Sequence, residues 1–429
     1  MEIPMHYRNI ALSASTLAIA IGSAGAAQAE LSPLVAGYAD IAKYAYEDSL
    51  EGARAMQVPI EKLLEEPSEE NLEAAREAWV AARVPYMKTE VYRFGNAIVD
   101  DWEARVNAWP LDEGLIDYVD ASYGNSSDEN DFYAVNVIAN PEITVAGVDI
   151  DATEIDADLL QNSLHEIGGN EANVATGYHA IEFLLWGQDL NGTDAGSGDR
   201  PYTDFDVDNC TGGNCDRRAQ YLRAATSLLI TDLEEMVANW QEDGAARQAL
   251  DDAGEENAIS MMLTGMGSLS YGELAGERMR LGLMLHDPEE EHDCFADKTH
   301  WSHYYDARGI RNVYLGQLER DNGEMFKAED SLSAHVAGID PKLDAEMKAE
   351  LDASVDAMEV IVKRAEEDGE AYDQMIGAGN EEGNLVVQNA VDALVKQTHT
   401  IERIVSALGV KEITIEGSDS LDNPEAVFQ

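Results

Sequence analysis

Apolar residues recur at helical spacing through most of the chain, and the pattern is clearest between residues 384 and 408. There the side chains are separated alternately by four and by three positions, which places them along one face of a helix. They are Val387, Val391, Leu394, Thr398, Ile401, Val405 and Leu408. Gly409 follows directly, as glycine often does where a helix ends. We therefore expect this helix to pack one face against the core of a bundle.

Other segments show the same spacing, and only 11 prolines interrupt the 429 residues, which favours long helices over many short strands. Ser68 is a favourable N-cap, because its hydroxyl can accept a hydrogen bond from the first turn of a helix. The first helix is expected to break at Val58-Pro59, since proline lacks the N–H group that a helix needs. The expected helices span residues 31–64, 69–94, 156–166, 172–186, 216–240, 258–285, 343–367 and 384–408.

A polar loop rich in Gly, Asp and Thr, residues 191–213, is the best candidate for a domain boundary. The sequence thus predicts an all-α fold of two helical-bundle domains, residues 30–209 and 210–415, followed by a tail at 416–429. Irregular inserts are expected in both halves. One short β-hairpin is expected between residues 135–138 and 143–145.

The charge balance excludes one large class of function. The chain has 28 Lys and Arg against 84 Asp and Glu, so its formal charge is 28 − 84 = −56. A nucleic-acid-binding surface needs clustered cations, which this chain lacks. Hydrophobic residues make up 45% of the chain, as in an ordinary globular protein, so we expect a folded core under a strongly solvated acidic surface.

The first 29 residues have the features of a secretory signal peptide. An apolar run of twelve residues, 10–21, is too short to span a bilayer, which takes about 20 residues. Ala27-Gln28-Ala29 forms an A-x-A cleavage site before Glu30. An uncleaved membrane anchor is the alternative. We expect cleavage after Ala29, no membrane span in the mature chain, and a periplasmic location.

Two of the three cysteines lie close together in a glycine-rich turn. Cys210 and Cys215 can close a small disulfide loop in an oxidising compartment. A pair of metal thiolates is the alternative, but two further ligands at zinc-finger spacing are missing. Cys294 is left over, and we expect it to be a buried free thiol.

His179 and Glu182 form the sharpest candidate site. On a helix they are three positions apart, so the imidazole and the carboxylate project from the same face. Such a pair suits two ligands of one metal ion, as in metal sites inside helical bundles. The flanking residues are apolar, which places the pair near a packed region. A local hydrogen-bonded pair without a ligand is the alternative.

A second polar cluster lies between residues 286 and 308. Within it, Asp297, His300 and Asp306 are candidate metal ligands, although no fixed ligand spacing recommends them. A hydrated acidic loop that leads into a helix is the alternative. Glu90 and Arg93 are also three positions apart, and by pattern alone they form a local ion pair.

Gly177-Tyr178-His179-Ala180-Ile181-Glu182 resembles the G-x-H-x-x-E motif of the imelysin family, which includes bacterial iron-regulated proteins. Five further blocks resemble the family, so that the resemblance covers about residues 40–415. These blocks are residues 89–94, 107–114, 209–218, 294–300 and 309–316. One departure is Lys298, which places a cation where the family pattern has a polar uncharged residue.

The resemblance implies an all-helical protein of two bundle-like domains, with the motif near the groove between them. It also implies an exported protein linked to iron acquisition, in which His179 and Glu182 are the motif residues. Glu90, Arg93 and Asp112 become candidate lining residues by the same resemblance, and Tyr178 joins them as part of the motif block.

Three functions remain open at this point. The leading hypothesis is a periplasmic binding protein that holds iron, or a small metal chelate, at His179 and Glu182, with envelope iron-uptake components as partners. The second is a metallopeptidase, implied by the family, in which His179 and Glu182 hold zinc instead of iron and Glu182 is also the candidate catalytic residue. A hydrolytic zinc usually has three protein ligands, and the sequence does not identify the third.

The third hypothesis is a protein that binds an organic ligand such as a polysaccharide. In that case Trp109, Trp186 and Tyr178 stack on the ligand, while the motif pair only donates and accepts hydrogen bonds.

Overall fold

The computed structural model describes residues 31–128, 130–411 and 413–428. These residues are mainly helical and include two small antiparallel sheets, which confirms the predicted all-α fold. No helix among them combines the length and apolar character that crossing a bilayer requires. The predicted signal peptide and its cleavage site, residues 1–29, lie outside the described residues.

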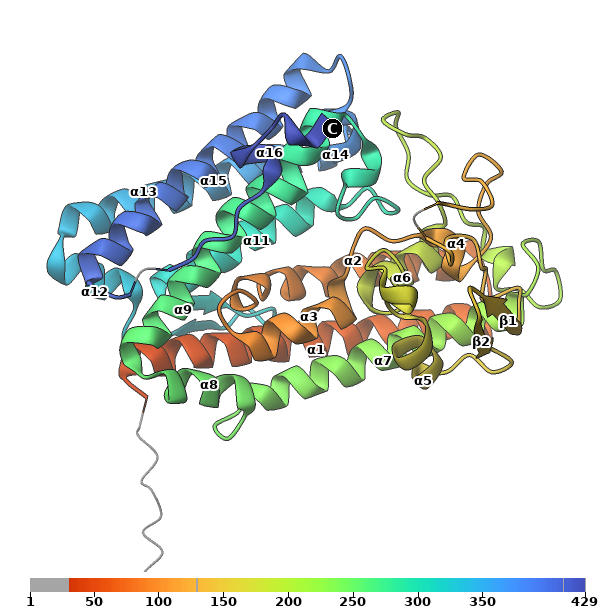
Figure 1. The fold of residues 1–429 in the computed structure, drawn as a ribbon, viewed down its shortest axis with the longest axis horizontal. Coiled ribbons are helices and arrows are strands. Elements are labelled where there is room, and N and C mark those ends of the chain that lie inside the picture. The colour runs from red at the N-terminus through yellow and green to blue at the C-terminus, as the bar shows by residue number, and fades with distance from the viewer. Residues whose placement is uncertain (1–30, 129, 412, 429) are drawn as a thin grey trace, which may run out of the picture. The chain divides into compact units, whose positions relative to one another are not determined.

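Four helices within residues 33–239 pack together around one part of the core. They are α1 (Pro33–Glu65), α2 (Glu69–Met87), α6 (Gly177–Trp186) and α7 (Cys215–Asn239). Helix α1 lies against α2 and α7, and α6 lies against α2 and α7 (Figure 1). Helix α3 (Ala97–Asn107) packs against α6 and α7. The two ends of α6 are therefore held by neighbours on several sides.

A second group of helices follows α7 in the sequence. It comprises α9 (Glu255–Ser268), the π-helical segment η5 (Leu269–Leu281), α10 (Gly282–Leu285), α11 (Thr299–Leu315), α13 (Pro341–Glu366) and α15 (Glu381–Leu408). Helix α13 packs against α11 and α15, and α15 also packs against η5. Helix α11 reaches across to α2 and so joins the two groups. The predicted division of the chain at residue 209 stays a prediction.

Short elements connect these helices. The helical ones are α4 (Glu113–Ile116), α5 (Ala157–Leu159), α8 (Ala245–Ala253), α12 (Leu332–Ile339), α14 (Tyr372–Ile376) and α16 (Asp419–Asp422). Further turns of 3-10 or π-helix cover Glu90–Tyr92, Leu160–Leu164, Ile167–Gly169, Tyr202–Asp204, Pro288–Glu290 and Ala426–Phe428. The strands are β1 (Glu142–Val145), β2 (Val148–Asp151), β3 (Gln317–Glu319) and β4 (Met325–Lys327).

The predicted helix signals at both ends of the chain are confirmed. The Ser68 hydroxyl accepts a hydrogen bond from the Asn71 N–H at 3.3 Å and caps α2. Gly409 takes a left-handed backbone conformation, with φ of 68°, where α15 ends. Along α15, Val387 and Leu394 are fully buried, so the predicted apolar stripe does face the core.

The predicted break at Val58-Pro59 is wrong, because α1 continues through Pro59 as far as Glu65. Proline removes one hydrogen bond to the carbonyl four residues earlier. That carbonyl belongs to Ala55, an exposed residue, so water can satisfy it. Ile60 and Leu63 are fully buried beyond the proline, and their burial holds the last turns in line.

The predicted hairpin is also placed wrongly. Strand β1 pairs with β2, which follows it, and not with residues 135–138, which form no strand. Ala146 and Gly147 connect the strands, and both have positive φ values, 52° and 83°. Positive φ at both positions is the backbone conformation that a two-residue hairpin turn needs. An Ala-Gly pair predicts such a turn only weakly, because Asn-Gly and Asp-Gly are the usual pairs. The second hairpin, in which β3 pairs with β4, was not predicted from the sequence.

Candidate functional site

Helix α6 carries the motif, and its first residue explains why glycine stands there. Gly177 has a φ of 79°, and a Cβ at this position would lie 2.4 Å from the backbone oxygen of Val106. Any side chain would therefore push α6 away from the end of α3. This contact also starts the helix at Gly177, five residues later than the sequence predicted.

His179 and Glu182 point toward one another from the first turns of α6. The His179 Nδ1 and Glu182 Oε2 atoms are 2.8 Å apart. The other carboxylate oxygen, Oε1, accepts a hydrogen bond from the Ala296 N–H at 3.0 Å. Both oxygens of Glu182 are thus engaged, whereas the buried Nε2 of His179 has no hydrogen-bond partner among the described residues. Nε2 is the ring nitrogen left for a ligand.

Burial controls the protonation of this pair. It lowers the pKa of His179 well below its usual value, and the nearby Arg83 and Arg278 lower it further. Burial, together with the charge of Asp293, raises the pKa of Glu182 well above its usual value. Burial thus favours the neutral form of each group. A cation at Nε2 would hold the imidazole proton on Nδ1, where Glu182 accepts it in a hydrogen bond.

The loop before α11 supplies a third group, Asp293, which the sequence did not identify as a ligand. Its Oδ1 lies 4.0 Å from His179 Nδ1, and the ligand atoms of His179, Glu182 and Asp293 all lie within 4.8 Å of one another. Arg83 of α2 donates to Asp293 Oδ1 at 2.8 Å. The Ser302 hydroxyl donates to the other oxygen, so Asp293 is fixed from two sides.

His292 lies beside this group and is a second residue that sequence reasoning left out of the site. Its ring centroid is 5.0 Å from that of His179 and 5.1 Å from that of Trp109. The side chain is buried, and neither ring nitrogen has a partner among the described residues. Burial lowers its pKa well below the usual value, so the imidazole is neutral and able to bind a metal.

A cavity of about 400 Å3 opens onto both histidines. Carboxylates dominate its polar wall. The acidic lining residues are Asp112, Glu113, Glu289 and Glu291. Trp109 and Phe295 supply apolar surface. Burial, followed by the charge of Glu113, raises the pKa of Glu289 to about 7. The cavity is therefore suited to a cationic guest.

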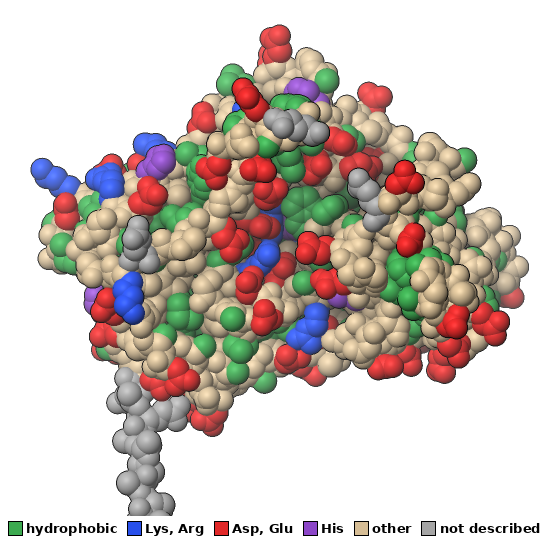
Figure 2. Space-filling view, viewed as in Figure 1, with side chains coloured by type: hydrophobic (Ala, Val, Ile, Leu, Met, Phe, Trp, Pro, Cys, Tyr) green, Lys and Arg blue, Asp and Glu red, His purple; other side chains and the backbone are tan. Residues whose placement is uncertain are grey.

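Acidic side chains also dominate the face of the molecule in Figure 2, where several surround a depression near the middle. A second hollow, of about 480 Å3, shares Trp109 and Pro110 with the main cavity. Arg93 lines this second hollow, with Glu103 and Glu273 beside it. Trp186 lines a third hollow, and Arg200 is also part of its wall.

The predicted lining residues therefore lie at different places in the structure. Asp112 lines the main cavity and Arg93 the second hollow. Glu90 is buried against Arg278, with Oε2 and Nη2 2.6 Å apart, and is not among the residues that line either space. Tyr178 is fully buried, and its hydroxyl donates to the Ala82 carbonyl at 3.4 Å. Of the three aromatic residues in the organic-ligand hypothesis, Trp109 lines the main cavity.

The second predicted cluster also divides among different partners. His300 Nε2 lies 2.8 Å from Glu366 of α13. Asp306 Oδ2 accepts from Arg278 at 3.1 Å. Asp297 instead approaches two other carboxylates, which are described below. Because α11 begins at Thr299, these side chains point to different neighbours although they are close in sequence.

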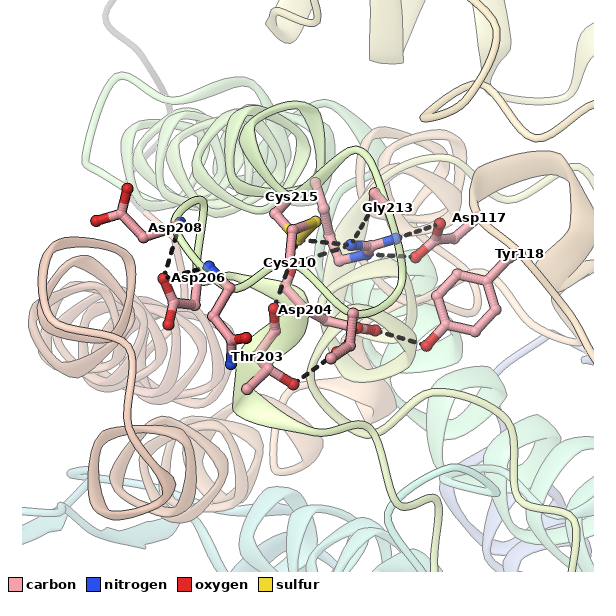
Figure 3. Close-up of a disulfide and its surroundings, with 12 residues drawn as sticks. Asp117, Tyr118, Thr203, Asp204, Asp206, Asp208, Cys210, Gly213 and Cys215 are labelled. Atoms are coloured by element: carbon pink, nitrogen blue, oxygen red, sulfur yellow. Dashed lines mark hydrogen bonds and ion pairs between the residues drawn. A yellow bond between two sulfur atoms is a disulfide. The ribbon is translucent and has the colours of Figure 1, made fainter.

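Cys210 and Cys215 form a disulfide at the start of α7 (Figure 3). Asp204, beside this loop, accepts a hydrogen bond from the Tyr118 hydroxyl (Figure 3). Arg218, one turn into α7, donates to Asp117 and to the Gly213 carbonyl. The disulfide thus closes a loop that is packed against a buried ion pair. Cys294 is a free, half-buried thiol at the main cavity.

Replacing Cys210 and Cys215 together by alanine is expected to lower the free energy of unfolding by about 2 kcal/mol, because the unfolded chain gains the freedom of an open loop. Denaturant unfolding with and without the double substitution measures this. Cys294→Ala is the control, since it removes a thiol but no crosslink. Equal stability of the double variant and the wild-type protein would contradict the prediction.

Comparisons with known proteins agree with this fold. The family model described as Imelysin matches residues 42–401. Iron-regulated protein A of Synechococcus elongatus is 28% identical over 116 residues, which cover 26% of this chain and 33% of that protein. The chain thus matches about a third of this curated relative's length.

Two solved structures share the fold. One, described as a precursor of iron-regulated protein A from Parabacteroides distasonis, has a TM-score of 0.61 and 18% identity, over 90% of this chain and 97% of that chain. The other, an imelysin-like protein from Psychrobacter arcticum, has a TM-score of 0.55 and 16% identity, over 89% of this chain and 98% of that chain. With a family model that spans most of its length, this chain belongs to the imelysin family.

Proposed function

We propose that this protein is exported to the periplasm and takes part in iron acquisition by binding iron at the motif on α6. The observation that carries the proposal is the unpartnered Nε2 of His179, a fully buried imidazole nitrogen at the wall of an acidic cavity. Buried polar atoms are almost always hydrogen-bonded, so an unpaired one at a cavity indicates a missing ligand.

The donor set suits a first-row transition metal. His179 and His292 offer neutral imidazoles, which favour iron and zinc, and the surrounding carboxylates favour iron among these. In this arrangement Glu182 holds the His179 ring by accepting from Nδ1, as carboxylates commonly do behind a metal-bound histidine. Asp293 adds negative charge beside the pair, and the ion pair with Arg83 partly neutralises that charge.

The cavity supports binding of either a free ion or a small chelate. Its volume of about 400 Å3 is within the range of small-molecule sites. Four carboxylates on its wall raise the local concentration of cations. The link to iron rests on the relatives named for iron regulation, and the periplasmic location rests on the sequence of residues 1–29. Envelope iron-uptake components are the partners that this role implies.

A metallopeptidase role would use the same residues differently. Hydrolysis needs a base that can take a proton from a metal-bound water. Glu182 is poorly placed for this, because both of its oxygens already accept hydrogen bonds. Digestion of an unfolded polypeptide, with and without a chelator, tests the role, and cleavage that a chelator abolishes would favour it over simple binding.

Iron analysis of the purified protein tests the proposal. After anaerobic loading with Fe(II) and desalting, the wild-type protein is expected to retain about one iron per chain, and His179→Ala to lose most of it. Glu182→Gln is expected to weaken binding by about 10–100-fold, the usual effect of removing a group that orients a ligand. His399→Ala is the matched control, because His399 is an exposed histidine on α15. Equal iron content in the wild-type protein and His179→Ala would reject the site.

A further inference from the structure

Three carboxylates meet between the loop before α11 and the start of α14. Glu291 and Asp297 come from the loop, and Asp373 comes from the first turn of α14. Oxygens of the three lie within 4.8 Å of one another. All three side chains are buried, with exposed fractions of 2%, 8% and 1%. Like charges at this separation repel strongly when water is excluded.

The surrounding protein does not balance this charge. Both oxygens of Glu291 and both oxygens of Asp373 lack a hydrogen-bond partner among the described residues. The Thr299 hydroxyl acts to lower the pKa of Glu291 and the N–H of Gln374 acts to lower the pKa of Asp373, but burial outweighs both effects. Lys298 is the cation that acts on Asp297, and its ammonium group is paired with Glu366 at 3.1 Å.

Burial, followed by the charge of Asp373, raises the pKa of Asp297 to about 8. Burial also raises the pKa of Asp373 to about 7 and the pKa of Glu291 well above its usual range. The ionised form of the cluster is therefore costly unless a positive group enters it.

An independent observation comes from the neighbouring Tyr372. Its side chain is fully buried, and its hydroxyl also has no partner among the described residues. The charge of Glu291 contributes, after burial, to raising the pKa of this tyrosine, so the two groups lie close enough to interact. An unpaired hydroxyl beside unpaired carboxylates is expected where a ligand completes the set.

We propose that Glu291, Asp297 and Asp373 form a second cation site, separate from the His179 site and selective for a hard divalent cation of the calcium type. The donors are carboxylate oxygens, which favour calcium and magnesium over softer metals. Calcium accepts a flexible shell of carboxylate oxygens, whereas magnesium demands near-ideal octahedral geometry and usually keeps several waters, so three buried carboxylates suit calcium better.

The position of the site gives the cation a structural role. It joins α14 to the same loop that carries His292 and Asp293. Glu291 also lines the main cavity, so the loop is shared by both sites. Calcium here would hold the loop against α14 and keep the residues that face His179 in place. This inference does not depend on the proposed function, because it needs only the cluster itself.

Calorimetric titration of chelator-stripped protein with CaCl2, at about 0.15 M KCl to screen the acidic surface, tests the inference. The wild-type protein is expected to bind one calcium per chain with a dissociation constant below about 1 mM. Asp373→Asn keeps the shape of the side chain and is expected to weaken binding about tenfold or more. His179→Ala is expected to bind calcium as the wild-type protein does, which separates the two sites.

Asp368→Asn is the matched control, because Asp368 is an exposed acidic residue close in sequence to Asp373. Circular dichroism of each variant checks that the fold is intact. Absence of one-to-one calcium binding in the wild-type protein would overturn the inference. Equal calcium affinity of the wild-type protein and Asp373→Asn would overturn it as well, and would show that the three carboxyl groups are neutralised by protons instead.

Discussion

Replacing Arg278 by methionine is expected to lower the free energy of unfolding by about 3–5 kcal/mol, the usual cost of leaving buried charges without their partner. Arg278 is fully buried in η5 and serves three carboxylates. Its distances to oxygens of Glu90, Glu273 and Asp306 are 2.6, 2.7 and 3.1 Å. Methionine fills similar space, so the loss is mainly that of the charge and its hydrogen bonds.

The effect of Arg278→Met should depend on pH with a definite sign. Burial acts to raise the pKa of Glu273, but Arg278 and Arg93 together bring it below its usual value. A carboxylate with a lowered pKa in the folded state stabilises the protein above its unfolded pKa, about 4.3 for Glu, and loses this as the pH falls. The difference between wild-type protein and variant should therefore be fully present above about pH 5 and shrink as the pH falls below about 4.3.

Denaturant unfolding at several pH values measures both parts of this prediction. Arg403→Met is the control, because Arg403 is half exposed on α15 and solvent screens its ion pair with Glu346, so losing the pair should change stability little. A variant Arg278→Met as stable as Arg403→Met would show that the buried network contributes little.

Asp117→Asn is expected to destabilise the protein by a similar amount, about 3–5 kcal/mol. Asp117 is buried and binds two arginines that are themselves buried, Arg200 and Arg218. Arg218 reaches both of its oxygens, at 2.6 and 2.9 Å, and Arg200 reaches one at 2.7 Å. Asparagine preserves the shape of the side chain but removes its negative charge. Asp204 is then the carboxylate that still pairs with Arg200.

Thermal or denaturant unfolding of Asp117→Asn measures this loss. Asp208→Asn is the control in the same region, because Asp208 is an exposed residue just before the disulfide loop (Figure 3). We expect the control to stay within about 0.5 kcal/mol of the wild-type protein. Similar stabilities of the two variants would mean that Asp204 and backbone carbonyls suffice for both arginines.

Local patterns in the sequence predicted the parts of the structure that depend on neighbours along the chain. The stripe on α15 and the caps at Ser68 and Gly409 are of this kind. So is the meeting of His179 with Glu182, because three positions on a helix bring two side chains to one face. The metal role of that pair remains a proposal.

Contacts between distant segments could not be predicted in the same way. Arg83 and Asp293 are 210 positions apart, and nothing near either residue signals their ion pair. His292 and Asp293 lay inside the acidic segment that the sequence singled out, so enrichment in histidine and acidic residues was the available signal. The same enrichment suggested that His300 and Asp306 share one site, but their side chains, both on α11, contact separate partners.

The residues that contact the motif are far apart along the chain, so the chain must fold before the site can form. Glu182 meets the Ala296 amide across 114 positions, and Arg83 meets Asp293 across 210. The unfolded chain therefore does not hold these groups together, and the site exists only in the folded protein. In the proposed function the metal is therefore bound only after the chain has folded, and its binding then stabilises the folded form against unfolding.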